Sequence, residues 1–74
     1  MTYDQAKLDE LVEDWGFATE DDLASAFVFE GVSPAICMNE GCGYSTEYEP
    51  DQDHGWCENC NTNTVKSAFV LMGI

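Results

Sequence analysis

Cys37-Met-Asn-Glu-Gly-Cys42, followed after fourteen residues by Cys57-Glu-Asn-Cys60, is the stretch of sequence that decides the fold. Two short loops with two cysteines each, separated by a strand, a turn and a strand, form the pattern of a tetrahedral Cys₄ zinc site. The hairpin expected between the loops would bring all four sulfurs to one ion. Thiolates at about 2.3 Å from the metal select Zn²⁺ over hard cations. The sequence therefore predicts one Zn²⁺ per chain, bound by Cys37, Cys42, Cys57 and Cys60.

The residues around the cysteines agree with tight turns. Gly41 and Gly43 flank Cys42, and glycine permits the backbone curvature that turns loop amides toward the sulfurs. Asn61 follows Cys60, and asparagine tolerates a left-handed backbone better than most other residues do. These residues support a metal site at both loops.

Other uses of the four cysteines remain open at the level of sequence. Iron is compatible with four thiolates in a rubredoxin-like centre, although the wide first loop argues against it. A redox dithiol of Cys57 and Cys60 would leave the first pair unused, and it normally stands at the start of a helix. Two disulfides would suit a secreted protein, and the first residues of this chain show no signal peptide.

His54 and Trp56 lie close to the second cysteine loop. His54 is the only histidine, and as a ligand it would replace one cysteine in a Cys₃His site. Because four cysteines already form two pairs, we expect His54 to be an exposed turn residue. Trp56 is expected to shield the site, with a role as an aromatic recognition residue as the alternative.

An enzyme is not expected. A catalytic zinc keeps one coordination position open and usually has His or carboxylate ligands, whereas four thiolates close the shell. No Cys–His, Ser–His or glutamate arrangement beside an open metal position is apparent, and the spacing of the carboxylates indicates no catalytic pair.

Residues 1–31 have the periodicity of two helices. The first is predicted from about Tyr3 to Trp15, with a capping-box pattern of Thr2 and Gln5 at its start and Gly16 at its end. Its apolar residues form one stripe: Leu8, Leu11, Val12 and Trp15.

A second helix is predicted to begin at the N-cap Thr19 and to end before Gly31. It is expected to run antiparallel to the first helix and form a helical hairpin. We expect the apolar stripes to form the core; a groove for a partner helix is the alternative.

Residues 32–74 are predicted to form a zinc ribbon and a C-terminal apolar segment. A strand at about residues 62–65 is expected to turn into a short helix. The predicted fold class is therefore a small α+β zinc-binding domain: an N-terminal helical hairpin over residues 1–31 and a zinc-ribbon β-hairpin over residues 32–74.

Length and charge limit the function. The chain has 74 residues, 15 Asp and Glu against 2 Lys and Arg, and a net charge of −13. It is short enough for a single domain over residues 1–74, and a core of this size rarely supplies more than about 3–5 kcal/mol, so a metal staple is expected. Two cations form no basic patch, which argues against direct binding of nucleic acid or of anionic membranes. A cytoplasmic, monomeric protein with reduced thiols is expected.

The segment from Pro34 to Gln52, with Cys37 and Cys42, and the segment from Gly55 to Val65, with Cys57 and Cys60, resemble the zinc ribbon of a group of small acidic proteins from proteobacteria and their phages. The resemblance extends over most of the chain and implies a zinc site, but no established activity. Zinc ribbons in general bind nucleic acids or proteins. The wider first loop, Asn61 in place of glycine and the scarcity of Lys and Arg depart from that wider pattern.

The sequence thus favours a non-catalytic structural-zinc protein that acts as an adaptor for another protein with a basic surface. One alternative is a nucleic-acid-associated ribbon within a larger complex. Another is an acidic imitation of DNA that inhibits a DNA-binding protein. A dithiol oxidoreductase is the least favoured function. A further alternative is that the negative charge serves only to keep the domain soluble and monomeric.

Overall fold

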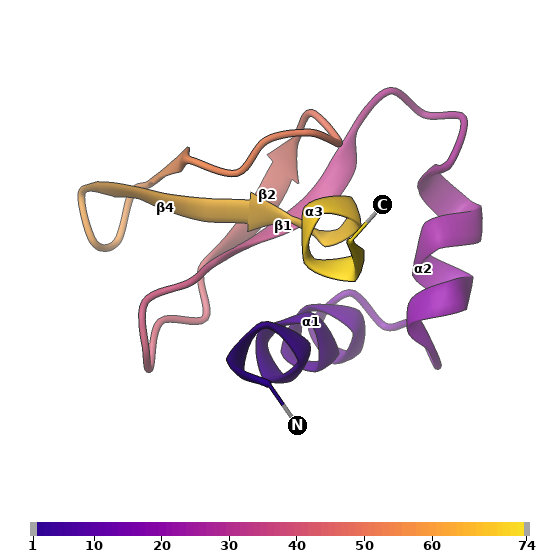
Figure 1. The fold of residues 1–74 in the computed structure, drawn as a ribbon, viewed down its shortest axis with the longest axis horizontal. Coiled ribbons are helices and arrows are strands. Elements are labelled where there is room, and N and C mark those ends of the chain that lie inside the picture. Colours follow the sequence, from indigo (N-terminus) through magenta and orange to yellow (C-terminus); the bar gives the residue numbers. More distant parts are fainter. Residues whose placement is uncertain (1, 74) are drawn as a thin grey trace.

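A computed structural model of the chain describes residues 2–73, which form three helices and a four-stranded antiparallel sheet (Figure 1). The helices are α1 (Tyr3–Asp14), α2 (Glu20–Phe27) and α3 (Ala68–Met72). The strands are β1 (Ser33–Cys37), β2 (Ser45–Tyr48), β3 (Gly55–Cys57) and β4 (Thr62–Ser67). The predicted α+β fold class is confirmed. None of the helices in the described part of the chain is long and apolar enough to cross a membrane.

Helix α1 begins where the capping pattern places it. The side chain of Thr2 accepts a hydrogen bond of 3.0 Å from the backbone amide of Gln5. The side chain of Gln5 does not complete the capping box. It donates instead to Asp9 at 2.9 Å and to Glu20 at 3.2 Å, and so joins the first turns of α1 and α2.

Helix α1 ends at the glycine that the sequence indicated. Gly16 has a φ of 80° and donates from its amide to the carbonyl of Glu13 at 3.0 Å. The amide of Phe17 donates to the carbonyl of Val12, also at 3.0 Å. These two bonds form a Schellman motif, which requires the left-handed residue at this position.

Helix α2 starts at the predicted N-cap, because the side chain of Thr19 accepts a 3.1 Å hydrogen bond from the amide of Asp22. It does not lie antiparallel to α1. In Figure 1, α1 is seen nearly along its axis while α2 is seen from the side, so the two helices cross. The expected antiparallel packing is therefore wrong: the buried stripe of α1 packs with Ile36 of β1 and Ala68 of α3, and only Leu23 of α2 is fully buried in the same cluster.

The order of strands in the sheet is β2-β1-β4-β3, and all pairs are antiparallel. The hairpin expected between the two cysteine loops does not form, because β2 and β3 lie at opposite edges of the sheet. Each cysteine loop instead connects the two strands of its own hairpin, β1–β2 or β3–β4. The segment that connects β2 to β3 is bound to the end of β4. The amide of Ser67 donates to the Gln52 carbonyl at 2.9 Å, and the Ser67 hydroxyl donates to the Pro50 carbonyl at 2.5 Å.

The sheet curls so that Tyr48 of β2 packs over Gly55 of β3. A Cβ atom placed on Gly55 would lie 2.7 Å from Cε2 of the Tyr48 ring, closer than any real contact. The Tyr48 hydroxyl also donates to the carbonyl of Trp56 at 2.7 Å. A glycine at position 55 is therefore needed for the close approach of the two edges.

Side chains alternate across β1 and divide the core into two clusters. Ile36 faces the helices and packs with buried apolar residues that come from them: Leu8, Leu11, Val12, Leu23 and Ala68. Ala35 and Cys37 face the opposite side and pack with Cys57 and Val65. The predicted core role of the α1 stripe is confirmed.

The C-terminal segment forms a strand that turns into a helix, as predicted. Ser67 ends β4 and caps α3 by accepting a 3.2 Å hydrogen bond from the Val70 amide. Ala68 is fully buried in the cluster that contains the α1 residues. Helix α3 thus covers the junction between α1 and the sheet (Figure 1).

Candidate metal centre

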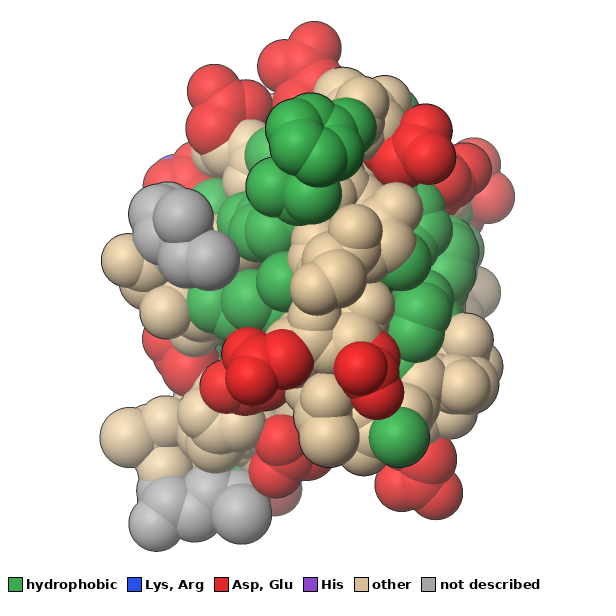
Figure 2. Space-filling model, turned by 90° about the vertical axis from the view of Figure 1, so that its right-hand side faces the viewer, with side chains coloured by type: hydrophobic (Ala, Val, Ile, Leu, Met, Phe, Trp, Pro, Cys, Tyr) green, Lys and Arg blue, Asp and Glu red, His purple; other side chains and the backbone are tan. Residues whose placement is uncertain are grey.

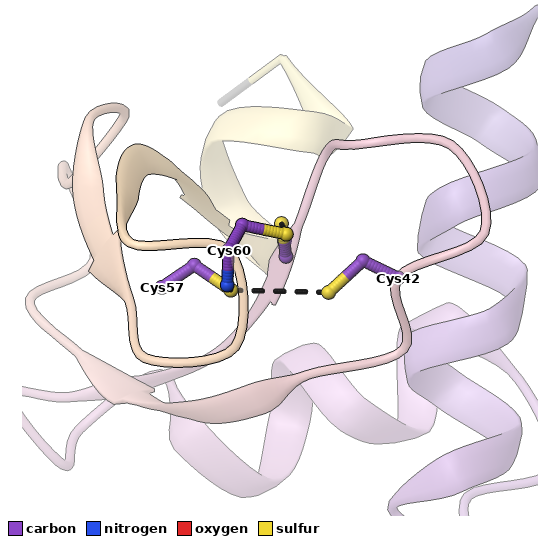
Figure 3. A group of neighbouring side chains, drawn as sticks. Cys42, Cys57 and Cys60 are labelled. Atoms are coloured by element: carbon purple, nitrogen blue, oxygen red, sulfur yellow. Dashed lines mark hydrogen bonds between the residues drawn. The ribbon is translucent and has the colours of Figure 1, made fainter.

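The structure brings all four cysteine sulfurs together, although the cysteines lie in different loops and strands. The four Sγ atoms lie within 4.8 Å of one another. The Sγ atoms of Cys42 and Cys57 are 3.8 Å apart (Figure 3). Those of Cys37 and Cys60 are 3.9 Å apart. A tetrahedron with metal–sulfur bonds of about 2.3 Å has edges of about 3.8 Å. Two of the sulfur pairs therefore match this edge length, and the four sulfurs are close enough together to hold one metal ion.

Strand pairing positions the ligands. Cys37 is the last residue of β1 and Cys57 the last residue of β3, while Cys42 and Cys60 lie in the loops that follow these strands. Strand β4 pairs with both: Val65 stands opposite Cys37, and Thr62 stands opposite Cys57. The central pairing of β1 with β4, rather than a hairpin between the loops, brings the four sulfurs together.

Left-handed residues shape both cysteine loops. Gly41 has a φ of 80° and Asn61 a φ of 57°, so Asn61 adopts the conformation for which the sequence indicated it. The amide of Cys60 donates to the sulfur of Cys57 at 3.4 Å. Such amide–sulfur bonds favour the thiolate form that a metal ligand needs.

The thiols differ in how readily they ionise. Burial opposes the ionisation of Cys37, but hydrogen bonds from the Thr64 hydroxyl, at 3.2 Å, and from the Asn39 amide lower its pKa to about 7. At Cys42, the amide of Tyr44 lowers the pKa, but burial and the neighbouring cysteines outweigh it, so the pKa is raised. Burial is the main cause of the raised pKa of Cys57. Four thiolates in one small volume therefore need a cation between them.

Lys7 is a residue of this site that the sequence did not indicate. It lies on α1 and is 6% exposed, and its Nζ donates to the carbonyl of Cys42 at 2.7 Å and to that of Asn39 at 2.9 Å. Lys66, six residues after Cys60, is the cation nearest to a cysteine in the sequence, whereas Lys7 is thirty residues away from Cys37 along the chain. The Tyr3 hydroxyl, also from α1, donates to the carbonyl of Met38. The first turns of α1 thus bind the backbone of the first cysteine loop.

One signal in the sequence could have identified Lys7. It stands four residues before Leu11 and next to Leu8, so it lies on the edge of the buried stripe of α1. A lysine at such an edge can bury its long stem and carry its ammonium group to a polar partner beyond the helix. The identity of that partner depends on tertiary structure.

His54 lies outside the cluster, as expected. Its side chain is 76% exposed and its Nδ1 lies 2.6 Å from the Asp53 carboxylate. Trp56 does not shield the site: its neighbours Gly55 and Cys57 are buried on one face of β3, while Trp56 is 45% exposed on the other. Tyr44 and Tyr48 pack against the cysteine cluster in its place.

Comparison of the chain with known protein families, with curated proteins and with solved structures gives no significant match. The resemblance to small acidic zinc-ribbon proteins therefore stays a prediction. What can be said of the site comes from its own geometry. Four clustered cysteines on two hairpins can hold one metal ion and join the hairpins through it.

Proposed function

We propose that this chain is a non-catalytic structural-zinc domain that binds another protein. The observation that supports the metal is the cluster of four sulfurs within 4.8 Å of one another. Four protein thiolates fill the tetrahedral shell of Zn²⁺ and leave no position for water or substrate, which is typical of structural rather than catalytic zinc. In this role the ion links the β1–β2 hairpin to the β3–β4 hairpin.

Native mass spectrometry of the purified protein, together with elemental analysis and a thiol count, tests the metal. We expect one zinc ion per chain and no thiols that react until the protein is denatured with a chelator. Replacement of Cys42 by Ser should abolish stoichiometric binding, whereas His54→Ala, a neighbouring exposed residue, should retain it. A metal-free chain, one iron ion per chain or two disulfides would contradict the assignment of zinc.

The surface charge supports a partner that is a basic protein. Of the 15 Asp and Glu residues, all except Glu20 are exposed, whereas Lys7 is buried against the first cysteine loop and Lys66 is half-buried. A partner with a basic surface would be attracted to such a surface at a rate that decreases with salt. Direct contact with phosphates is disfavoured, because few cations are left to make it.

A binding experiment with the zinc-loaded protein separates the partner classes. Immobilised protein should retain a specific basic protein at low salt and release it at high salt, and it should not retain duplex DNA or RNA. Retention of nucleic acid would support the alternative ribbon function. If the immobilised protein retains a DNA-binding protein and duplex DNA displaces it, this would support the alternative in which the acidic surface mimics DNA. Neither result would contradict the zinc site, which is measured separately.

A further inference from the structure

One surface hollow lies between segments that are far apart in the sequence. It is lined by Val28, Pro50, Asp51 and Phe69 and has a volume of about 290 Å³. Val28, just after α2, is 57% exposed, and Phe29, the next residue, is 96% exposed. Single exposed apolar residues are common, but an apolar hollow with an exposed aromatic residue next in the chain to one of its lining residues is typical of binding surfaces.

A buried serine joins two of the segments that line the hollow. The hydroxyl of Ser67 donates to the carbonyl of Pro50, which lines the hollow, and accepts from the amide of Val70, in the first turn of α3. Phe69, which also lines the hollow, belongs to that same turn. Ser67 is fully buried, so its two hydrogen bonds join the Pro50 segment to the first turn of α3 beneath the surface.

Charge distinguishes between the candidate occupants. Asp51 lines the hollow, and Glu30 follows Phe29; both are exposed. Figure 2, which views the molecule from the side of α2, shows hydrophobic side chains in adjoining groups with carboxylates around them. A second copy of this chain would bring a further net charge of −13 to this surface, so self-association is disfavoured.

We propose that this hollow, which we call the Val28–Phe69 hollow, binds a segment of a partner protein that has one large apolar side chain flanked by Lys or Arg. The apolar side chain would fill the hollow, and Phe29 would cover it. The flanking cations would face Asp51 and Glu30. This inference rests on the proposed function as a protein-binding domain, and it names the surface and the chemistry of the segment.

The test uses zinc-loaded full-length protein and two fluorescein-labelled peptides. Both are rich in lysine, and they differ only at the centre, where one has leucine and the other alanine. We expect the leucine peptide to bind at least about tenfold more tightly in fluorescence anisotropy, because a large apolar side chain becomes buried. The affinity of both peptides should decrease with salt.

Two exposed positions provide the variants, so their folding should be intact. Val28→Ser combined with Phe29→Ser should remove most of the preference for leucine while leaving the salt dependence unchanged. Trp56→Ser, which removes an exposed aromatic ring on β3, should keep the preference. Asp51→Asn should weaken the binding of both peptides by the same factor.

Several outcomes would overturn the inference. Equal binding of the two peptides would show attraction by charge alone, as in an imitation of DNA. If the Trp56 variant and the Val28/Phe29 variant lose the preference for the leucine peptide equally, the hollow is not the binding site. Concentration-dependent dimers in sedimentation that the Val28/Phe29 variant abolishes would identify a second copy as the occupant. If a basic protein is still retained at low salt, only the hollow is rejected and the proposed function stands.

Discussion

The ammonium group of Lys7 donates a 2.7 Å hydrogen bond to the carbonyl of Cys42, and this bond joins the N-terminal helix to a candidate metal ligand. The proposed Zn²⁺ with four thiolate ligands would carry a net charge of about −2 in a protein that is already strongly acidic. Lys7 is the buried cation that contacts the loop around this charge. It also satisfies the carbonyl of Asn39 at 2.9 Å.

Lys7→Met should therefore weaken metal retention. The variant keeps the length of the side chain but removes the charge and leaves two loop carbonyls without their donor. Because residues that support metal ligands commonly change affinity about 10–100-fold, we expect at least about a tenfold loss. Competition with a chromophoric chelator measures it. Lys66→Met changes the net charge equally and should retain nearly normal affinity; equal loss in both variants would show an effect of net charge alone.

Removal of the metal should unfold the cysteine-bearing half of the chain, residues 35–65. Repulsion and the loss of the shared ion would separate the hairpins, while α1 keeps part of its helical structure. Tyr44 and Tyr48, which pack against the cysteines, should lose their near-ultraviolet circular dichroism after chelation. Helical far-ultraviolet signal should persist in part, and added zinc should restore both signals. A near-ultraviolet spectrum that does not change on removal of the metal would contradict this prediction.

Metal affinity should increase with pH through the neutral range. The raised pKa values of Cys42 and Cys57 mean that these thiols carry protons at neutral pH in the metal-free protein, and Cys37 titrates at about 7. Protons therefore compete with the metal, and binding releases them. Chelator competition between pH 6 and pH 8 should show a steadily tighter apparent affinity, with protons released into weakly buffered solution. An affinity independent of pH would indicate thiols that are already ionised.

Gly55→Ala should destabilise the metal-loaded protein by about 1–3 kcal/mol, because the added methyl group overlaps the Tyr48 ring. Thermal unfolding measures the loss. Gly43→Ala is the matched control. A Cβ atom at position 43 meets nothing within 4 Å, so this substitution should change the stability little. Combining Gly55→Ala with Tyr48→Ala should cost less than the sum of the single changes, because the overlap is then absent. Additive costs would show that Tyr48 is not the cause.

Local rules predicted the parts of the structure that depend on neighbours in the sequence. The caps at Thr2 and Thr19, the left-handed Gly16 and Asn61 and the strand-to-helix change at Ser67 all follow from short patterns. The candidate ligand set followed from cysteine spacing. Each of these depends on a few consecutive residues.

The remaining features depend on contacts between distant segments. The spacing of the cysteines does not distinguish the observed pairing of β1 with β4 from a hairpin between the two cysteine loops, because either arrangement brings the loops together. The partner of Lys7 is more than thirty residues away. The side of β3 on which Trp56 lies depends on strand register, because a shift of one residue reverses the face.

The arrangement of the two hairpins has a consequence for how the chain folds. Residues 33–48 and 55–67 each close a short loop of their own, so each unit can form through contacts that are local in sequence. Binding of the ion then has to bring only these two units together, so the slow search for distant partners is reduced to one encounter. Refolding should thus be fast up to this encounter and should depend on zinc concentration only in its final phase.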